Sequence, residues 1–139
     1  MKNLIKTFGI IAFVAVLGLG LFTSCAEDPV PTDITITGIT STYEGKYAVI
    51  GLSKSISDQA VLAVGLGKTI SGGTATWDLL DQDANAYSVK DGTYLVMIII
   101  YESKAAYEAD KDSEIYTGFA TTALKATDNT IAFSKFTEL

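Results

Sequence analysis

The chain has 139 residues, of which sixteen are Asp or Glu and ten are Lys, so its formal net charge is −6 at pH 7. It contains no Arg, no His and a single Cys. Without His, Ser-His-Asp triads and imidazole metal sites are excluded, and one cysteine cannot form an intrachain disulfide. An acidic chain without Arg is poorly suited to neutralise phosphates. We therefore expect neither a nucleic-acid partner nor enzymatic activity.

The N-terminal segment has the pattern of a secretory signal peptide. Lys2 and Lys6 precede an uncharged apolar run, Phe8–Phe22, which ends in the small or polar residues Thr23 and Ser24. A basic start, an apolar centre and a small-residue cleavage site are typical of signal peptides. The run is about 15 residues long and so falls short of the ~20 needed to span a bilayer. Removal of this segment is therefore predicted.

The only cysteine, Cys25, directly follows this segment in the sequence Leu21–Cys25 (LFTSC). This stretch resembles a bacterial lipobox, after which the cysteine is acylated and becomes the first residue of the mature chain. Phe22 stands where Leu is usual, as in the relaxed lipoboxes of spirochaetes and Bacteroidetes. The alternative is an ordinary cleaved signal with a chance cysteine. We expect a covalent lipid on Cys25 and a location in the bacterial cell envelope, at the outer membrane or cell surface.

The next stretch, Ala26–Thr32 (AEDPVPT), holds both prolines and two acids. Such a composition buries little apolar area and predicts an extended tether. Its acidic residues resemble the surface-export signals of Bacteroidetes lipoproteins, although a merely solvated linker explains them equally well. The expected division is a signal peptide at 1–24, a tether at 25–33 and one domain at 34–139.

From residue 34 onward the sequence alternates between apolar and polar residues or forms short apolar runs between Gly, Ser and Asp. These patterns predict a strand that includes Ile34 and Ile36, followed by strands at Tyr47–Leu52, Ala60–Leu66, Thr74–Leu80, Thr93–Tyr101, Ile115–Leu124 and Thr130–Phe136. About seven strands at this spacing are typical of an antiparallel β-sandwich. An all-β domain of that kind is therefore expected.

Two local predictions refine this scheme. Asp128-Asn129 has the composition of a tight turn, so the last two strands are expected to form a hairpin. Thr93–Tyr101 is apolar on both faces, which indicates either a central strand or a surface for a partner. We favour a central strand covered by a short helix at Ser103–Ala109, the one stretch of the domain with helix-forming composition.

Three segments carry a resemblance to a known family: Tyr43–Ile50 (YEGKYAVI), Ile70–Trp77 (ISGGTATW) and Asp91–Ile98 (DGTYLVMI). Together with the stretch from Phe119 to Ser134, they resemble a family of small spirochaete-type bacterial lipoproteins of unknown function, in which similar strands occur in this order. The resemblance implies an exported, lipid-anchored β-domain. It supplies no catalytic residues.

Carboxylates suggest one metal site, of the calcium type. Oxygen ligands alternate at Asp81, Asp83 and Asn85 as at the start of a calcium loop, but Ala86 replaces the turn glycine and Gly92 the bidentate Glu. A second acidic group includes Asp110 and Asp112, and in a sandwich both loops could lie at one end, as in C2-type calcium domains. We expect solvated loops rather than bound calcium, and keep these side chains as weak candidate ligands: Asp81, Asp83, Asn85, Asp110 and Asp112.

Aromatic residues offer a second kind of site. Several tyrosines fall near predicted strand ends, where they could line a carbohydrate or peptide surface: Tyr43, Tyr87, Tyr101, Tyr107 and Tyr116. Trp77 shares a strand face with Ala75 and Leu79 and is predicted to lie in the core. The sequence thus favours a lipid-anchored, non-enzymatic binding or structural module with an unknown protein or carbohydrate ligand. The alternative is a calcium-dependent adhesion or lipid-binding module.

The lipid anchor can be tested by replacing Cys25 with Ala. The variant is expected to lose acylation and to be either unprocessed or soluble, because two acyl chains at about 0.8 kcal/mol per buried CH₂ hold a protein almost permanently. Membrane fractionation with mass spectrometry of the N-terminus checks this. A Cys25→Ala protein that is cleaved and still partitions with membranes would contradict the lipoprotein prediction.

Overall fold

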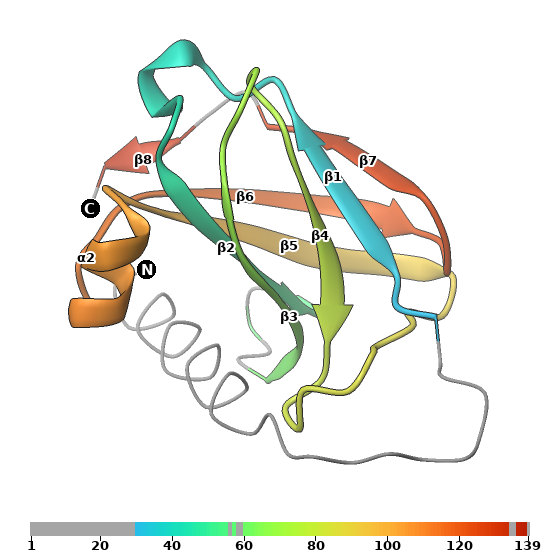
Figure 1. Cartoon of the computed structure of the whole chain (residues 1–139). Helices are drawn as coiled ribbons and strands as arrows, with labels where there is room; N and C mark the ends of the chain where they lie inside the picture. The colour runs from blue at the N-terminus through green and yellow to red at the C-terminus, as the bar shows by residue number, and fades with distance from the viewer. Residues whose placement is uncertain (1–29, 56, 58–59, 134–135, 139) are drawn as a thin grey trace.

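The computed structural model describes residues 30–55, 57, 60–133 and 136–138. Within them, eight strands form one curled sheet in the order β7-β1-β4-β3-β2-β5-β6-β8. The all-β prediction is confirmed. The curl brings β1 to β4 in front of β5 and β6, so that the inner face of the sheet encloses a core (Figure 1). The predicted signal peptide and Cys25 lie outside the described residues.

The elements match most of the predicted ranges and add a two-residue strand at the end. The strands are β1 Asp33–Thr37, β2 Tyr47–Ser53, β3 Val61–Thr69, β4 Ala75–Leu80, β5 Gly92–Tyr101, β6 Glu114–Leu124, β7 Asn129–Ala132 and β8 Thr137–Glu138. The helices are the 3₁₀ turn η1 Ser41–Tyr43 and the α-helix α2 Lys104–Ala109.

The predicted hairpin between the last two long strands is wrong. β7 pairs with β1 instead, and this is the sheet's one parallel pairing, which departs from the fully antiparallel arrangement expected. The chain does turn just before β7, through a bend at residues 126–127 and through Asp128, whose φ is 51°, but Asn129 already belongs to the strand. The Asn129 side chain then accepts a hydrogen bond from the Lys125 amide at 2.9 Å and donates one to the Asp33 carbonyl at 3.2 Å. The turn therefore directs the chain to β1 rather than back along β6.

The inner core is built around Trp77 on β4, which is 0% exposed, as predicted for this residue. Its indole Nε1 donates a hydrogen bond to the Ala48 carbonyl at 3.2 Å. Gly65 on β3 makes room for the ring, because a Cβ there would lie 2.6 Å from Trp77 Cβ and 2.5 Å from Ile50 Cγ1. The core therefore depends on the packing of the large Trp77 side chain against Gly65, which has no side chain.

Strand β5 is buried on both faces, as predicted. Its inner face contributes Ile98 to the core, and its outer face contributes Ile99 and Tyr101 to a second apolar cluster. Helix α2 packs on the outer face through Tyr107, whose ring centroid is 5.0 Å from that of Tyr101. The central-strand interpretation of this segment is therefore confirmed.

The strand registers divide the sheet into two ends. We call the end where β1 begins the base and the opposite end the tip. At the base, the start of β5 lies beside the end of β6 (Gly92 opposite Leu124), whereas at the tip the end of β5 lies beside the start of β2 (Tyr101 opposite Tyr47). The β4–β5 and β6–β7 connections therefore lie at the base, and α2 lies at the tip.

Thr32 fastens the start of the domain to the base. Its amide donates to the Tyr87 carbonyl at 2.9 Å and its carbonyl accepts from the Leu79 amide at 3.0 Å. Its hydroxyl donates to the Ala126 carbonyl at 2.8 Å and accepts from the Val89 amide at 2.9 Å. The domain therefore includes Thr32, slightly before the predicted boundary at residue 34, and the chain enters it at the base.

The double burial of β5 is tested by Ile98→Asp on the inner face and Ile99→Asp on the outer face, at residues 0% and 1% exposed. Each is expected to unfold the domain, because an unpaired buried carboxylate costs several kcal/mol against a total stability of ~5–15 kcal/mol. Circular dichroism melting measures this. Thr93→Asp, at an exposed position of the same strand, is the control and should keep the wild-type Tm. A wild-type Tm for Ile99→Asp would show that the outer face is open to solvent.

Candidate functional site

The first acidic loop, which follows β4, satisfies its own hydrogen bonds. Asp81 Oδ1 accepts from the amides of Asp83 and Asn85, both at 2.9 Å. The Asn85 side-chain amide also approaches both Asp81 carboxylate oxygens at 3.4 Å. Asp81 therefore acts as the closing residue of a turn, in which Ala84 has φ 62°.

The second acidic group lies at the tip, after α2. Asp110 Oδ1 accepts from the Asp112 amide at 2.9 Å, again within one turn. The ten residues of β5 separate the two loops, which corresponds to roughly 30 Å at about 3.3 Å per residue. The expectation that both loops could lie at one end is therefore wrong. Among the described residues, no group of three or more His, Cys, Asp or Glu side chains could hold a metal ion.

The tyrosines proposed as a binding surface have different positions. Tyr43 is buried at the tip, where its ring centroid is 4.7 Å from that of Tyr116 and 4.8 Å from that of Phe136. Tyr101 is fully buried, and its hydroxyl donates to the Lys111 carbonyl at 3.0 Å. Of the five, Tyr107 is the one that borders the larger cavity described next, together with Tyr47, which sequence reasoning did not select.

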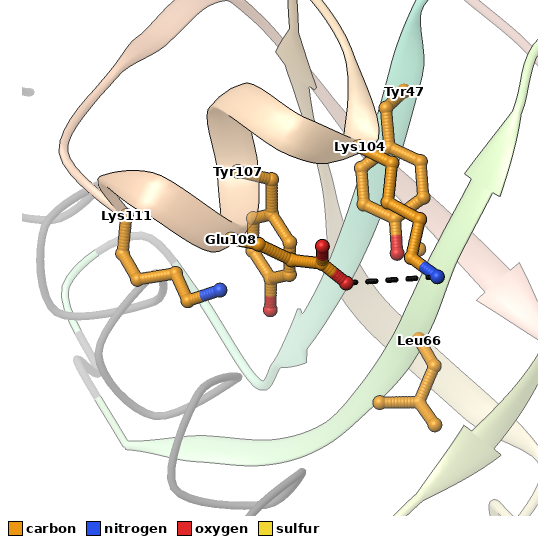
Figure 2. Close-up of a pocket in the computed structure, with 7 residues that line it drawn as sticks. Tyr47, Leu66, Lys104, Tyr107, Glu108 and Lys111 are labelled. Atoms are coloured by element: carbon orange, nitrogen blue, oxygen red, sulfur yellow. Dashed lines mark ion pairs between the residues drawn. The ribbon is translucent and has the colours of Figure 1, made fainter.

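A cavity of about 440 Å³ lies between α2 and the outer face of β2 and β3 (Figure 2). We call it the tip pocket. Its lining combines two phenols, one aliphatic side chain, a glycine and three charged groups: Tyr47, Leu66, Gly67, Lys104, Tyr107, Glu108 and Lys111. A volume of this size falls within the range of small-molecule sites in proteins.

A β-bulge creates the floor of the tip pocket. Ala48 pairs with Lys68 and Ile50 with Gly65, so Leu66 and Gly67 both lie opposite the single residue Val49. Such a bulge redirects side chains, and bulges are common beside functional sites. Gly67 is needed here, because a Cβ at this position would lie 2.0 Å from Tyr47 Cζ. The two glycines of one strand were the available sequence signal, since a strand glycine often marks close approach.

The aromatic wall of the tip pocket is held from two sides. The ring centroids of Tyr47 and Tyr107 are 5.3 Å apart with an interplanar angle of 42°. Burial raises the pKa of Tyr107 to about 12, with smaller contributions from Tyr47 and the Glu108 carboxylate. Burial also raises the pKa of Tyr47. Both phenols are therefore protonated at neutral pH and can donate hydrogen bonds.

The charged groups of the tip pocket come from α2. Lys104 Nζ lies 3.5 Å from Glu108 Oε1, and both side chains are more than half exposed, at 67% and 59%. Lys111 Nζ lies 3.5 Å from the Tyr107 ring centroid, an arrangement that favours a cation over the ring. Desolvation lowers the pKa of Lys111. The pocket therefore presents two ammonium groups and one carboxylate.

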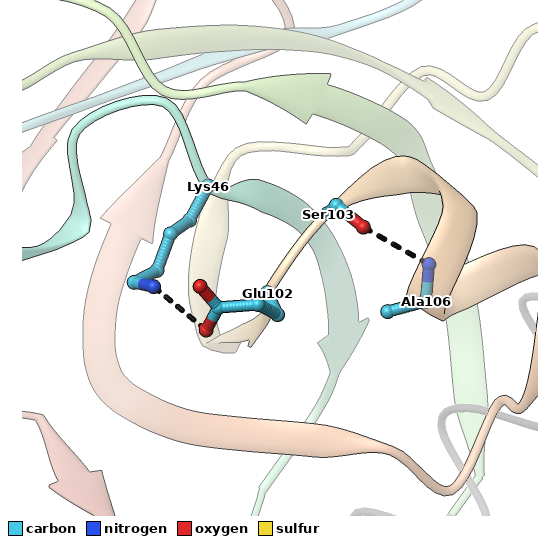
Figure 3. A network of polar contacts seen from close by, with 4 residues as sticks. All are labelled: Lys46, Glu102, Ser103 and Ala106. Atoms are coloured by element: carbon cyan, nitrogen blue, oxygen red, sulfur yellow. Dashed lines mark hydrogen bonds and ion pairs between the residues drawn. The ribbon is translucent and has the colours of Figure 1, made fainter.

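Contacts before the first turn fix α2 against the sheet (Figure 3). Lys46, just before β2, forms a 2.8 Å ion pair with Glu102, just after β5. Ser103 then caps the helix, since its Oγ accepts from the Ala106 amide at 3.1 Å. A serine cap stabilises the start of a helix by about 1 kcal/mol. These contacts determine where the α2 side chains of the pocket lie.

Searches against protein families, curated proteins and solved structures found no match to this chain. Within the part of the chain that the structure describes, no helix is long and apolar enough to cross a membrane.

Calcium binding by the first acidic loop can be tested by thermal unfolding. We expect millimolar Ca²⁺ to change the Tm no more than NaCl of equal ionic strength, because the Asp81 carboxylate is engaged by its own turn and the loop lacks the turn glycine and bidentate Glu of a calcium cage. The control is Asp81→Asn with Asp83→Asn. A calcium-specific rise in Tm that disappears in this double variant would establish a calcium site.

Proposed function

We propose that this chain is a lipid-anchored, non-enzymatic binding module of a bacterial cell envelope. The lipid is attached at Cys25, behind the basic and apolar N-terminal segment. The folded domain follows after the short predicted tether, and Thr32 at the end of that stretch is already fastened to the domain. The tip pocket is its ligand site. This proposal agrees with the resemblance of its strand motifs to small bacterial lipoproteins of unknown function.

The observation that carries this proposal is the placement of the pocket relative to the tether. Thr32 is fastened at the base, whereas the tip pocket lies at the other end of β2 and β5. The seven residue steps from Cys25 to Thr32 span at most about 25 Å. A lipid on Cys25 would therefore keep the base within about 25 Å of the membrane, with the pocket at the opposite end of the domain.

Charge supports a domain that projects from the membrane. Cleavage before Cys25 removes Lys2 and Lys6 and leaves eight lysines against sixteen acids. Anionic lipid attracts basic segments, so an acidic domain is repelled by such a surface. The lipid then holds the protein at the membrane while the domain projects from it.

The chemistry of the pocket supports binding. Its phenols are protonated at neutral pH, as the raised pKa values of Tyr47 and Tyr107 indicate. Protonated phenols and ammonium groups donate hydrogen bonds and orient a ligand. Rings and an aliphatic floor contribute apolar contact. Recognition of a ligand uses these groups without any bond being made or broken.

Purification of the intact lipoprotein from its native envelope tests the proposal. Mass spectrometry of the bound material is expected to find a ligand on the wild type that Leu66→Glu loses, because a carboxylate on the pocket floor removes apolar contact and occupies the cavity. Lys125→Glu, at an exposed position after β6 at the base, is the matched control and should retain it. Equal bound material in both variants, with wild-type Tm values, would contradict the proposal.

A further inference from the structure

We propose that the tip pocket selects a small organic carboxylate carried on a ring-sized body. This inference rests on the proposed binding function and names the ligand class of that site. The carboxylate would be held by Lys104 together with the two phenol hydroxyls, and the body would lie on Leu66 and Gly67.

The charge balance of the pocket is opposite to that of the chain. Among the residues that the structure describes, its charged lining residues are Lys104, Lys111 and Glu108, two ammonium groups and one carboxylate. The chain as a whole has sixteen acids and ten lysines. A local positive site on an acidic surface attracts an anion selectively, because the surrounding negative charge repels anions elsewhere.

Three hydrogen-bond donors lie on the same side of the pocket. In Figure 2 the hydroxyls of Tyr47 and Tyr107 both point to the side of the pocket where Leu66 lies. The Lys104 ammonium lies beside the Tyr47 hydroxyl. Neither hydroxyl has a hydrogen bond to another of the described residues. Their raised pKa values keep both protons in place. Each O–H can donate to one oxygen of a carboxylate.

The ion pair between Lys104 and Glu108 is weak. Its contact with Glu108 is 3.5 Å long between two exposed side chains, and exposed pairs at this spacing contribute little. A ligand carboxylate that also accepts hydrogen bonds from the phenols would bind this ammonium better. Glu108 remains nearby, which disfavours a doubly charged phosphate more than a singly charged carboxylate.

The body of the ligand is bounded by apolar groups. The bulge presents Leu66 and the bare backbone of Gly67, and the ring of Tyr47 forms one wall. The cavity of about 440 Å³ is large enough for one ring with a substituent. An acidic sugar and a cyclic carboxylic acid share this chemistry, and the test below distinguishes them.

The test titrates the full-length chain in a nonionic detergent and follows the backbone amide NMR signals of Gly67 and Tyr107. The probes are two matched pairs: methyl β-D-glucuronide with methyl β-D-glucoside, and benzoate with benzamide. At least one carboxylate is expected to shift both signals saturably, and its neutral counterpart to bind about tenfold more weakly, as charge-assisted hydrogen bonds are roughly twice as strong as neutral ones. The pair that responds identifies the sugar or the cyclic acid.

Variants with opposite effects separate recognition from structure. Lys104→Gln should weaken carboxylate binding about tenfold, whereas Glu108→Gln should strengthen it, because it removes a competing carboxylate. Lys125→Gln, the same change at the base, should leave the affinity within about twofold. A purely structural role of the Lys104–Glu108 pair would make both pocket variants change affinity in the same direction.

Three results would overturn the inference: equal binding of charged and neutral probes, weaker binding in Glu108→Gln, or no saturable shift of Gly67 and Tyr107 with any probe. The proposed binding function is judged separately, by the material that co-purifies from the envelope. Bound material that Leu66→Glu loses, together with any of these three results, would retain the binding module and reject its carboxylate ligand.

Discussion

The burial of β5 on both faces is the constraint on which the rest of the structure depends. Its inner side chains belong to the core that Trp77 anchors, and its outer side chains support α2 through the contact of Tyr101 with Tyr107. The strand also hydrogen-bonds to β2 on one side and β6 on the other. Because a strand apolar on both faces must be covered twice, the sheet curls over one face and a helix covers part of the other. The tip pocket arises beside that helix.

Two glycines on β3 leave room for aromatic side chains that pack against the strand. Gly65 admits Trp77 into the core, and Gly67 admits the ring of Tyr47 on the outer side. The bulge between them changes the direction in which the strand presents its residues. Without it, alternate residues of a regular strand would face the same side. The pocket floor therefore depends on an irregularity in the sheet rather than on a long loop.

The domain has a clear polarity. The tether joins at the base, where Thr32 makes four hydrogen bonds, and α2 with its tyrosines and lysines lies at the tip. Under the proposed function, this polarity separates the proposed attachment point from the proposed ligand pocket. One acidic loop lies at each end of the domain. In each loop a carboxylate, that of Asp81 or that of Asp110, accepts a hydrogen bond from an amide of its own turn.

The amino-acid sequence determined the class of the fold and most of its elements. Period-two alternation located the strands, the apolar run Thr93–Tyr101 indicated a central strand, and Trp77 was placed in the core, since these features depend on local burial patterns. The chain turns slightly before the predicted position, at residues 126–128, and the predicted partner strand was wrong, because local turn geometry does not determine which distant strand edge is free. Only the tertiary structure decided that β7 pairs with β1, that the acidic loops lie at opposite ends, and that Tyr47, Gly67 and α2 meet in one pocket. Each of these depends on contacts between segments far apart in the chain, whose formation depends on the curl of the whole sheet and on the bulge in β3.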